Sequence, residues 1–286
     1  MRYVELPVSA RLDPFVESLW LLEDAPAAGP REPRPIYPDG HVELIFNLGD
    51  PTAELRAGEA PRPQSRALLA GQLEGPVLVA AGSRLSLLGV RFRPEGAAAF
   101  AGLPLRELVG RVAPLEEVAG GWAGELLERL GNAPRDAASL LQDALARKLS
   151  GAAAPPTSLR AAVAAIGRSN GAATMDAVAR AAGVSTRELQ RGFARWVGLS
   201  PKRFARIVRF QSVLRADDAT WAEVAVACGY YDQAHLIRDF RELAGEVPTR
   251  VKSGFDGLSS AFALRASHSS KTVTQDAARL QSRRNE

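Results

Sequence analysis

The feature that most constrains this chain is a repeat in its carboxyl-terminal half. Residues 175–204 (MDAVARAAGVSTRELQRGFARWVGLSPKRF) align with residues 221–251 (WAEVAVACGYYDQAHLIRDFRELAGEVPTRV), with one extra residue in the turn of the second copy. The matched pairs are Val178 with Val224, Gly183 with Gly229, Leu189 with Leu236, Phe193 with Phe240, Gly198 with Gly245 and Pro201 with Pro248. Because each copy must solve the same packing problem, the repeat predicts two similar structural units in tandem.

Each copy contains the parts of a helix-turn-helix unit. Its first helix is short and rich in alanine (AVARAA, EVAVAC), so a second helix can cross it at close range. Gly183 and Gly229 follow those helices, where glycine adopts a left-handed turn at little cost. Side chains that cap helix starts flank the turns. They are Ser185 with Glu188, Thr220 with Glu223, and Asp232.

The second helix of each copy has one apolar and one polar face. A leucine and a phenylalanine four residues apart predict the buried face. The opposite face carries Arg and Gln, which pair bidentately with guanine and adenine in the major groove. The outer residues are Arg187, Gln190, Arg191 and Ala194 with Arg195 in copy one, and Gln233, Ala234, Ile237 and Arg238 with Arg241 in copy two. Between the copies, residues 201–218 predict one longer helix.

Two patterns in this region resemble the AraC/XylS family of bacterial transcription activators. They are A-x-x-x-G-V-S-x-R-x-L-Q-R-x-F at residues 179–193, and C-G-Y-Y-D-Q-A-H-L-I-R-D-F with G-x-x-P at residues 228–248. The resemblance covers residues 158 to about 252. It implies a seven-helix domain whose two recognition helices enter successive major grooves on one face of DNA.

By that resemblance, six residues stand where family members contact bases. They are Arg187, Gln190 and Arg191 in copy one, and Gln233, His235 and Arg238 in copy two. Phosphate contacts are predicted for Ser185, Arg195, Lys202, Arg203, Arg206, Arg209 and Arg241. Ile237 and Asp239 depart from the polar or basic residues common in the family. We therefore expect the second unit to contribute shape or phosphate contacts more than base readout.

The charge distribution agrees with a polyanion partner for one half of the chain. Residues 1–156 carry 16 Lys and Arg against 20 Asp and Glu, whereas residues 157–254 carry 15 against 9. An acidic segment joined to a basic one is typical of a protein whose two halves meet different partners. On charge alone, a solvated surface without function explains this equally well.

Several classes of protein are excluded or made improbable by composition. No stretch approaches the roughly 20 apolar residues that span a bilayer, and the amino terminus lacks a signal-peptide run. The single Cys228 excludes an intramolecular disulfide and is expected to be a small buried residue. The three histidines (His41, His235 and His268) have no metal-ligand spacing. We expect a cytoplasmic protein without membrane contact, metal or cofactor.

The chain is predicted to be of the α+β class. Residues 1–150 form a β-rich domain with short helices, 151–157 a linker, 158–254 the all-α domain with two helix-turn-helix units, and 255–286 a mostly disordered tail. Strands are expected at 42–48, 76–82 and 84–92, and a polar, Pro-rich surface loop at 51–63. The helix at 136–149 is amphipathic, which suits dimerisation and packing on its own domain equally well.

The amino-terminal domain has no motif of a known enzyme class. Residues 37–51 and 87–117 resemble an uncharacterised domain found ahead of AraC-type DNA-binding domains, which suggests sensing or dimerisation. Candidate ligand residues, near apolar strand ends, are Tyr37, His41, Glu43, Arg91 and Arg93. A structural ion pair is favoured over ligand binding for Arg91, and a turn role is favoured for Asp39 and Gly40. For Glu43, exposure to water is an open alternative.

Together these features predict a one-component transcription regulator that is not an enzyme. Its expected partners are double-stranded DNA, RNA polymerase, a small-molecule effector and a second copy of the chain. Three alternatives remain open: a DNA-repair enzyme with an AraC-type domain, an architectural DNA binder without sequence preference, and an amino-terminal domain that is itself an enzyme.

Overall fold

The computed structural model describes residues 2–29, 31–56, 58–216 and 220–253. Its amino-terminal part contains two antiparallel sheets, a six-stranded one of order β1-β2-β9-β4-β7-β10 and a four-stranded one of order β3-β8-β5-β6. The strands are β1 (Arg2–Leu6), β2 (Val16–Asp24), β3 (Arg34–Ile36), β4 (Glu43–Asn47), β5 (Thr52–Leu55), β6 (Arg62–Pro63), β7 (Ala67–Ala70), β8 (Val77–Ala81), β9 (Leu85–Phe92) and β10 (Val112–Pro114). The tail predicted at residues 255–286 lies outside the described residues.

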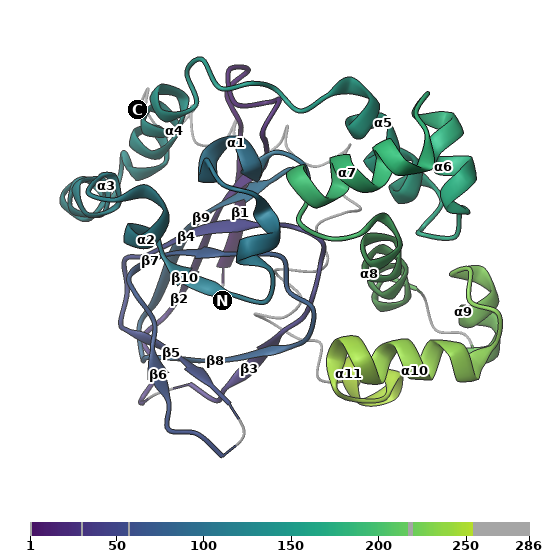
Figure 1. Ribbon diagram of the computed structural model, residues 1–286. Helices are drawn as coiled ribbons and strands as arrows, with labels where there is room; N and C mark the ends of the chain where they lie inside the picture. Colours follow the sequence, from purple (N-terminus) through teal and green to yellow (C-terminus); the bar gives the residue numbers. More distant parts are fainter. Residues whose placement is uncertain (1, 30, 57, 217–219, 254–286) are drawn as a thin grey trace, which may run out of the picture.

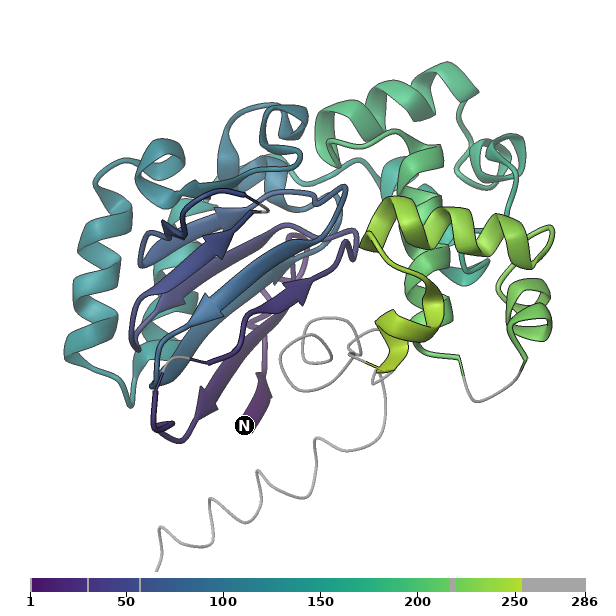
Figure 2. The same cartoon turned by 90° about the horizontal axis from the view of Figure 1, so that it is seen from below.

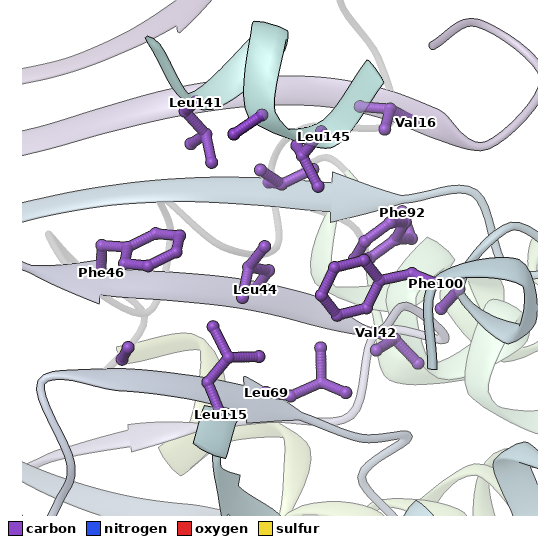
Figure 3. Packing of buried hydrophobic residues seen from close by; sticks show 14 of the residues in the cluster. Val16, Val42, Leu44, Phe46, Leu69, Phe92, Phe100, Leu115, Leu141 and Leu145 are labelled. Carbon is purple, nitrogen blue, oxygen red and sulfur yellow. The ribbon is translucent and has the colours of Figure 1, made fainter. Parts of the chain in front are cut away.

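Helices cover one face of the six-stranded sheet (Figure 1). They are α1 (Ala97–Ala101), the 3-10 turn η1 (Leu105–Leu108), α2 (Leu115–Ala119), α3 (Trp122–Asn132) and α4 (Ala137–Lys148). Strand side chains alternate between two faces, so Leu44 and Phe46 of β4 point towards these helices and share one core with Leu141 and Leu145 of α4 (Figure 3). The apolar face of α4 is thus buried against its own domain, the second of the two roles expected for this helix.

The opposite face of the six-stranded sheet packs against the four-stranded sheet. Trp20 of β2 is fully buried there. Its ring lies over Gly89 of β9, where an added Cβ would come within 2.1 Å of the indole. The loop predicted at residues 51–63 is a misassignment, because β5 and β6 lie within it. Pro63 is compatible with a strand because β6 is at the edge of its sheet.

The carboxyl-terminal part is all-helical within the described residues. Its helices are α5 (Thr157–Arg168), α6 (Met175–Ala181), α7 (Thr186–Trp196), α8 (Pro201–Leu214), α9 (Trp221–Ala227), α10 (Gln233–Ala244) and α11 (Pro248–Ser253). The α+β class and the seven helices expected from the resemblance are confirmed. They enclose a second core that includes Phe193, Phe210, Phe240 and, as predicted, the buried Cys228.

The two parts lie side by side (Figures 1 and 2) and contact each other through the central helix α8 and through α7, which packs against η1 and α1. Gln211 of α8 donates a 2.6 Å hydrogen bond from Nε2 to the carbonyl oxygen of Pro38. The Tyr37 and Phe210 rings pack edge to face, with centroids 6.2 Å apart. Gly40, with φ of +83°, brings the backbone so close to Phe204 that a Cβ would lie 2.9 Å from its ring. The turn at residues 37–40 is thus docked on α8.

Among the described residues, no helix has the length and apolar character that crossing a membrane requires.

Candidate nucleic-acid interface

The first recognition helix, α7, presents a continuous polar face to solvent. Its start is held by a capping box: the Ser185 hydroxyl accepts from the Glu188 backbone N–H, and Glu188 accepts from the Ser185 backbone N–H at 2.9 Å. Leu189 and Phe193 are buried, as predicted. The exposed residues of this helix include Arg187, Gln190, Arg191, Ala194 and Arg195. The side chains predicted to reach base edges in copy one therefore share one accessible face.

Ser185 itself is engaged in the cap. Its hydroxyl also donates to Glu188 Oε2 at 2.7 Å, so both of its donors go to the same carboxylate. These hydrogen bonds hold the pKa of the Glu188 carboxyl below its ordinary value. With its hydrogen-bond donors used, Ser185 no longer suits the phosphate contact predicted for it, and we leave it out of the contacts proposed below.

The second recognition helix, α10, is less open than the first. Asp232 caps its start by accepting from the His235 backbone N–H at 2.7 Å. Gln233, Arg238 and Arg241 are exposed. His235 is half-buried, its ring 5.2 Å from that of Tyr230 in a T-shaped contact. Ile237, expected on the outer face, instead packs partly against the core.

The connecting helix α8 corrects part of the phosphate prediction. Lys202 is exposed. Arg206, by contrast, forms a 2.8 Å ion pair with Asp239, whose carboxylate is buried in α10. Arg203 pairs with Glu242 of α10 and donates to the Glu74 carbonyl oxygen at 2.8 Å. Arg209 donates to the Gly171 carbonyl oxygen at 2.8 Å and lies over the Tyr230 ring.

These contacts join α8 and α10 through charged side chains. Arg206 also pairs with Glu242 at 2.5 Å, and the hydrogen bonds from Arg206 and Arg203 lower the pKa of the Glu242 carboxyl to about 2. Asp239 and Glu242 were not predicted as functional positions. Spacing within α10 carries no signal for them, because their partners lie on another helix. The network fixes the orientation of the second recognition helix relative to α8.

In the amino-terminal part, the candidate ligand residues form a buried charge network. Arg91 of β9 pairs with Asp39 at 2.5 Å and with Glu43 at 2.8 Å. Glu43 also accepts a 2.8 Å hydrogen bond from the Trp20 indole N–H. The structural ion pair considered for Arg91 is confirmed, and exposure of Glu43 to water is wrong, because the second sheet covers that face.

His41 connects this network to the domain surface. Its Nε2 lies 2.7 Å from Glu17 and its Nδ1 lies 2.9 Å from Arg91. Burial and Arg91 lower the pKa of His41, but the carboxylates of Glu17 and Asp39 outweigh them and leave that pKa above its ordinary value. Arg93 belongs to a separate pair with Asp13, at 2.8 Å. Of the five predicted ligand residues, His41, Arg91 and Arg93 line one cleft, and Tyr37 and Glu43 line the space between the sheets together with His41.

The space between the two sheets is small. It encloses about 90 Å³ and is lined mostly by apolar side chains, with Tyr37 and Glu43 among the polar ones. This is the interior of the β-layer, where a ligand was expected, and its enclosed volume lies below the roughly 300 to 1,000 Å³ of small-molecule sites.

The cap on α7 provides a direct prediction. Ser185→Ala is expected to lower the free energy of unfolding by about 1 kcal/mol, since it removes the hydroxyl that satisfies the start of the helix. Thr186→Ala, one residue further on, removes a hydroxyl without removing a cap and is expected to change stability by less than about 0.5 kcal/mol. Urea denaturation of both variants measures the difference. Equal losses would contradict the capping role.

Comparison with known proteins assigns families to both parts. Residues 4–114 match a family described as a domain of unknown function (DUF6597), and residues 178–254 match one described as a helix-turn-helix domain. The HTH-type transcriptional activator RhaS of Escherichia coli strain SE11 is 32% identical over 86 residues, which are 29% of this chain and 31% of the relative. The chain thus spans about a third of the length of the curated relatives it matches.

Two solved structures are also similar. A probable AraC family transcriptional regulator from Rhodopseudomonas palustris CGA009 is 28% identical, with a TM-score of 0.31 over 34% of this chain and 96% of its own. ToxT from Vibrio cholerae O395 is 7% identical, with a TM-score of 0.43 over 83% of this chain and 97% of its own. The capped tandem units and the sequence matches lead to one assignment: residues 178–254 belong to the matched family of helix-turn-helix domains, and residues 4–114 belong to the matched family of unknown function.

Proposed function

We propose that this chain is a sequence-specific DNA-binding regulator of transcription. The observation that carries the proposal is the pair of capped recognition helices, α7 and α10, each with a buried Leu–Phe pair and an exposed face of Arg and Gln. Arg and Gln are the side chains that distinguish guanine and adenine in the major groove. The basic balance of residues 157–254 supplies the attraction to phosphates.

The proposed DNA contacts are chosen by the solvent exposure of the side chains. We propose that Arg187, Gln190 and Arg191 of α7 read one groove, and that Gln233, His235 and Arg238 of α10 contact the next, with His235 the most covered of the six. Of the cations predicted to contact phosphates, we propose those that are exposed and form no ion pair among the described residues. These are Arg195, Lys202 and Arg241.

The consequences of binding are part of the same proposal. A regulator bound at a promoter recruits or excludes RNA polymerase, and RNA polymerase is therefore the proposed protein partner. Transcription regulation is the activity of the family to which the helix-turn-helix domain belongs, and we propose no catalytic activity. A bacterial regulator of this type acts in the cytoplasm, its proposed location. Light scattering of the full chain, with and without DNA, tests the homodimer.

Selection from a random DNA pool with the full chain tests the function. An enriched motif with two blocks about one helical turn apart is expected, because each recognition helix reads one major groove. A motif with a single block would mean that α10 mainly contacts phosphates rather than bases. If no motif is enriched and affinity only falls steeply with salt, the chain is an architectural binder and the proposal fails.

A pair of substitutions separates base readout from phosphate contact. Arg191→Ala is expected to cost about 1 to 3 kcal/mol on the selected site and to relax base preference at one position. Lys202→Ala is expected to weaken binding to all DNA sequences alike. It is also expected to reduce the slope of log affinity against log salt concentration by about one. Titration of each variant on selected and random duplexes measures both effects. Equal losses on the two duplexes for Arg191→Ala would contradict its assignment.

A further inference from the structure

A cleft of about 700 Å³ lies between the two parts of the chain. One wall comes from the amino-terminal part and includes Arg93 and Glu95, which follow β9. The other comes from α5 and α8 and includes Arg160, Gln211 and Arg215. The volume is within the range of small-molecule sites, roughly 300 to 1,000 Å³. Unlike the small space between the sheets, this cleft is bounded by both parts of the chain.

Two buried acceptors line the cleft without a hydrogen-bond donor. Glu95 is 4% exposed and its Oε2 has no hydrogen-bond partner among the described residues. Gln211 is also 4% exposed; its Nε2 is bound to Pro38, while its Oε1 has no partner within the same residues. Buried polar atoms are almost always paired, so two such oxygens in one cavity indicate a missing donor. Burial also raises the pKa of the Glu95 carboxyl.

Two cations of the cleft form no ion pair among the described residues, although the charge of Arg160 acts on the Glu95 carboxyl. Glu17 pairs with His41, Asp39 with Arg91, and Arg93 with Asp13. Across the described parts of the chain, neither Arg160 nor Arg215 forms an ion pair. Burial lowers the pKa of the half-buried Arg215, which reflects a guanidinium drawn out of water. A planar guanidinium binds a carboxylate through two parallel hydrogen bonds.

We propose that the cleft binds a small organic carboxylate that also carries a hydrogen-bond donor, such as an amino acid or a hydroxy acid. Its carboxylate pairs with Arg160 and Arg215. The ammonium of an amino acid donates to both Glu95 Oε2 and Gln211 Oε1, whereas the single hydroxyl of a simple hydroxy acid donates to one of them. A plain anion leaves both acceptors unsatisfied, and a simple amine leaves both arginines without a counter-charge.

Such a ligand would bear on regulation because both parts contribute to its site. Gln211 binds the ligand through Oε1 and the docked turn through Nε2, so occupancy of the cleft and the contact with Pro38 share one side chain. The effector role rests on the proposed function, whereas binding rests on the cleft alone.

Thermal unfolding of the full chain tests binding. The probes are the twenty standard amino acids, lactate and gluconate, with acetate, succinate, methylamine and glucose as comparators. At least one donor-bearing carboxylate is expected to raise Tm by about 5 °C at saturation, since ligands stabilise the state that binds them. The comparators are expected to leave Tm unchanged. No shift with any donor-bearing carboxylate, or an equal shift with acetate or methylamine, overturns the proposal.

Two variants locate the site. Arg160→Met changes an exposed residue, so folding is preserved, and Glu95→Gln keeps the shape of the side chain. Each is expected to reduce the ligand-induced shift at least twofold, while Arg168→Met, an exposed arginine of the same helix outside the cleft, retains it. A shift that survives both cleft variants overturns the site. If DNA selection enriches a motif but no ligand raises Tm, only the proposed ligand site is refuted. If a ligand raises Tm but no motif is enriched, only the proposed regulatory function is refuted.

Discussion

Arg91→Met is expected to lower the free energy of unfolding by about 3 to 5 kcal/mol, the range for breaking a buried ion pair by removing one partner. Arg91 is 4% exposed and faces two carboxylates, Asp39 and Glu43, of which Glu43 is also buried. Methionine fills a similar volume but removes the guanidinium that both carboxylates face. Much of the loss is therefore the cost of an uncompensated charge rather than of lost packing.

Urea denaturation of the full chain measures this effect, and Arg93→Met is the matched control. Arg93 lies two residues away on the same segment, but its partner Asp13 is 65% exposed. Exposed pairs contribute little, so we expect a loss below about 1 kcal/mol for the control. Equal losses for the two variants would mean that the pair buried between the sheets does not stabilise the fold.

The second large effect is expected from Arg206→Met. Removing this side chain leaves Asp239, 5% exposed, without its cation. We expect a loss of about 2 to 3 kcal/mol, below the range for a fully buried pair because solvent reaches part of Arg206. The salt dependence of DNA binding is expected to stay unchanged, because Arg206 serves the protein interior and not the phosphates.

Lys202→Met on the same helix provides the opposite pattern. Its exposed ammonium forms no ion pair within the part of the chain that the structure describes, so stability is expected to stay within about 0.5 kcal/mol of the parent chain. For Lys202→Met, the slope of log DNA affinity against log salt concentration is expected to fall by about one. If instead Arg206→Met left stability intact and reduced the salt slope, Arg206 would be a phosphate contact and the network between α8 and α10 would have no structural role.

The parts of the fold that the sequence predicted well depend on local signals. Glycines at turns and Ser, Thr or Asp at helix starts act within a few residues, and both capping boxes formed as expected. The strands β5 and β6 were missed because polar and proline-rich composition is also typical of loops. β5 pairs with β8, more than twenty residues further along the chain, and β6 in turn pairs with β5.

Only those features of the site that depend on the periodicity of a single helix could be predicted from the sequence. The exposed face of α7 follows from the buried Leu–Phe pair on the same helix. The internal role of Arg206 does not, because Asp239 is 33 residues away, and Arg203 reaches a carbonyl group 129 residues away. Similarly, strand alternation assigned Glu43 to the face opposite Leu44, but it carries no information on whether a second sheet covers that face.

The docking of the turn at residues 37–40 on α8 has a consequence for protein engineering. Regulators of this type look like two interchangeable modules joined at residues 149–156, and a chimera cut there would seem to keep both intact. Here the amino-terminal module covers Phe204 and Phe210 on the helix that connects the two DNA-reading units. A foreign sensor domain joined at that point would leave Phe204 and Phe210 exposed to solvent. A working hybrid must therefore also carry a turn equivalent to residues 37–40.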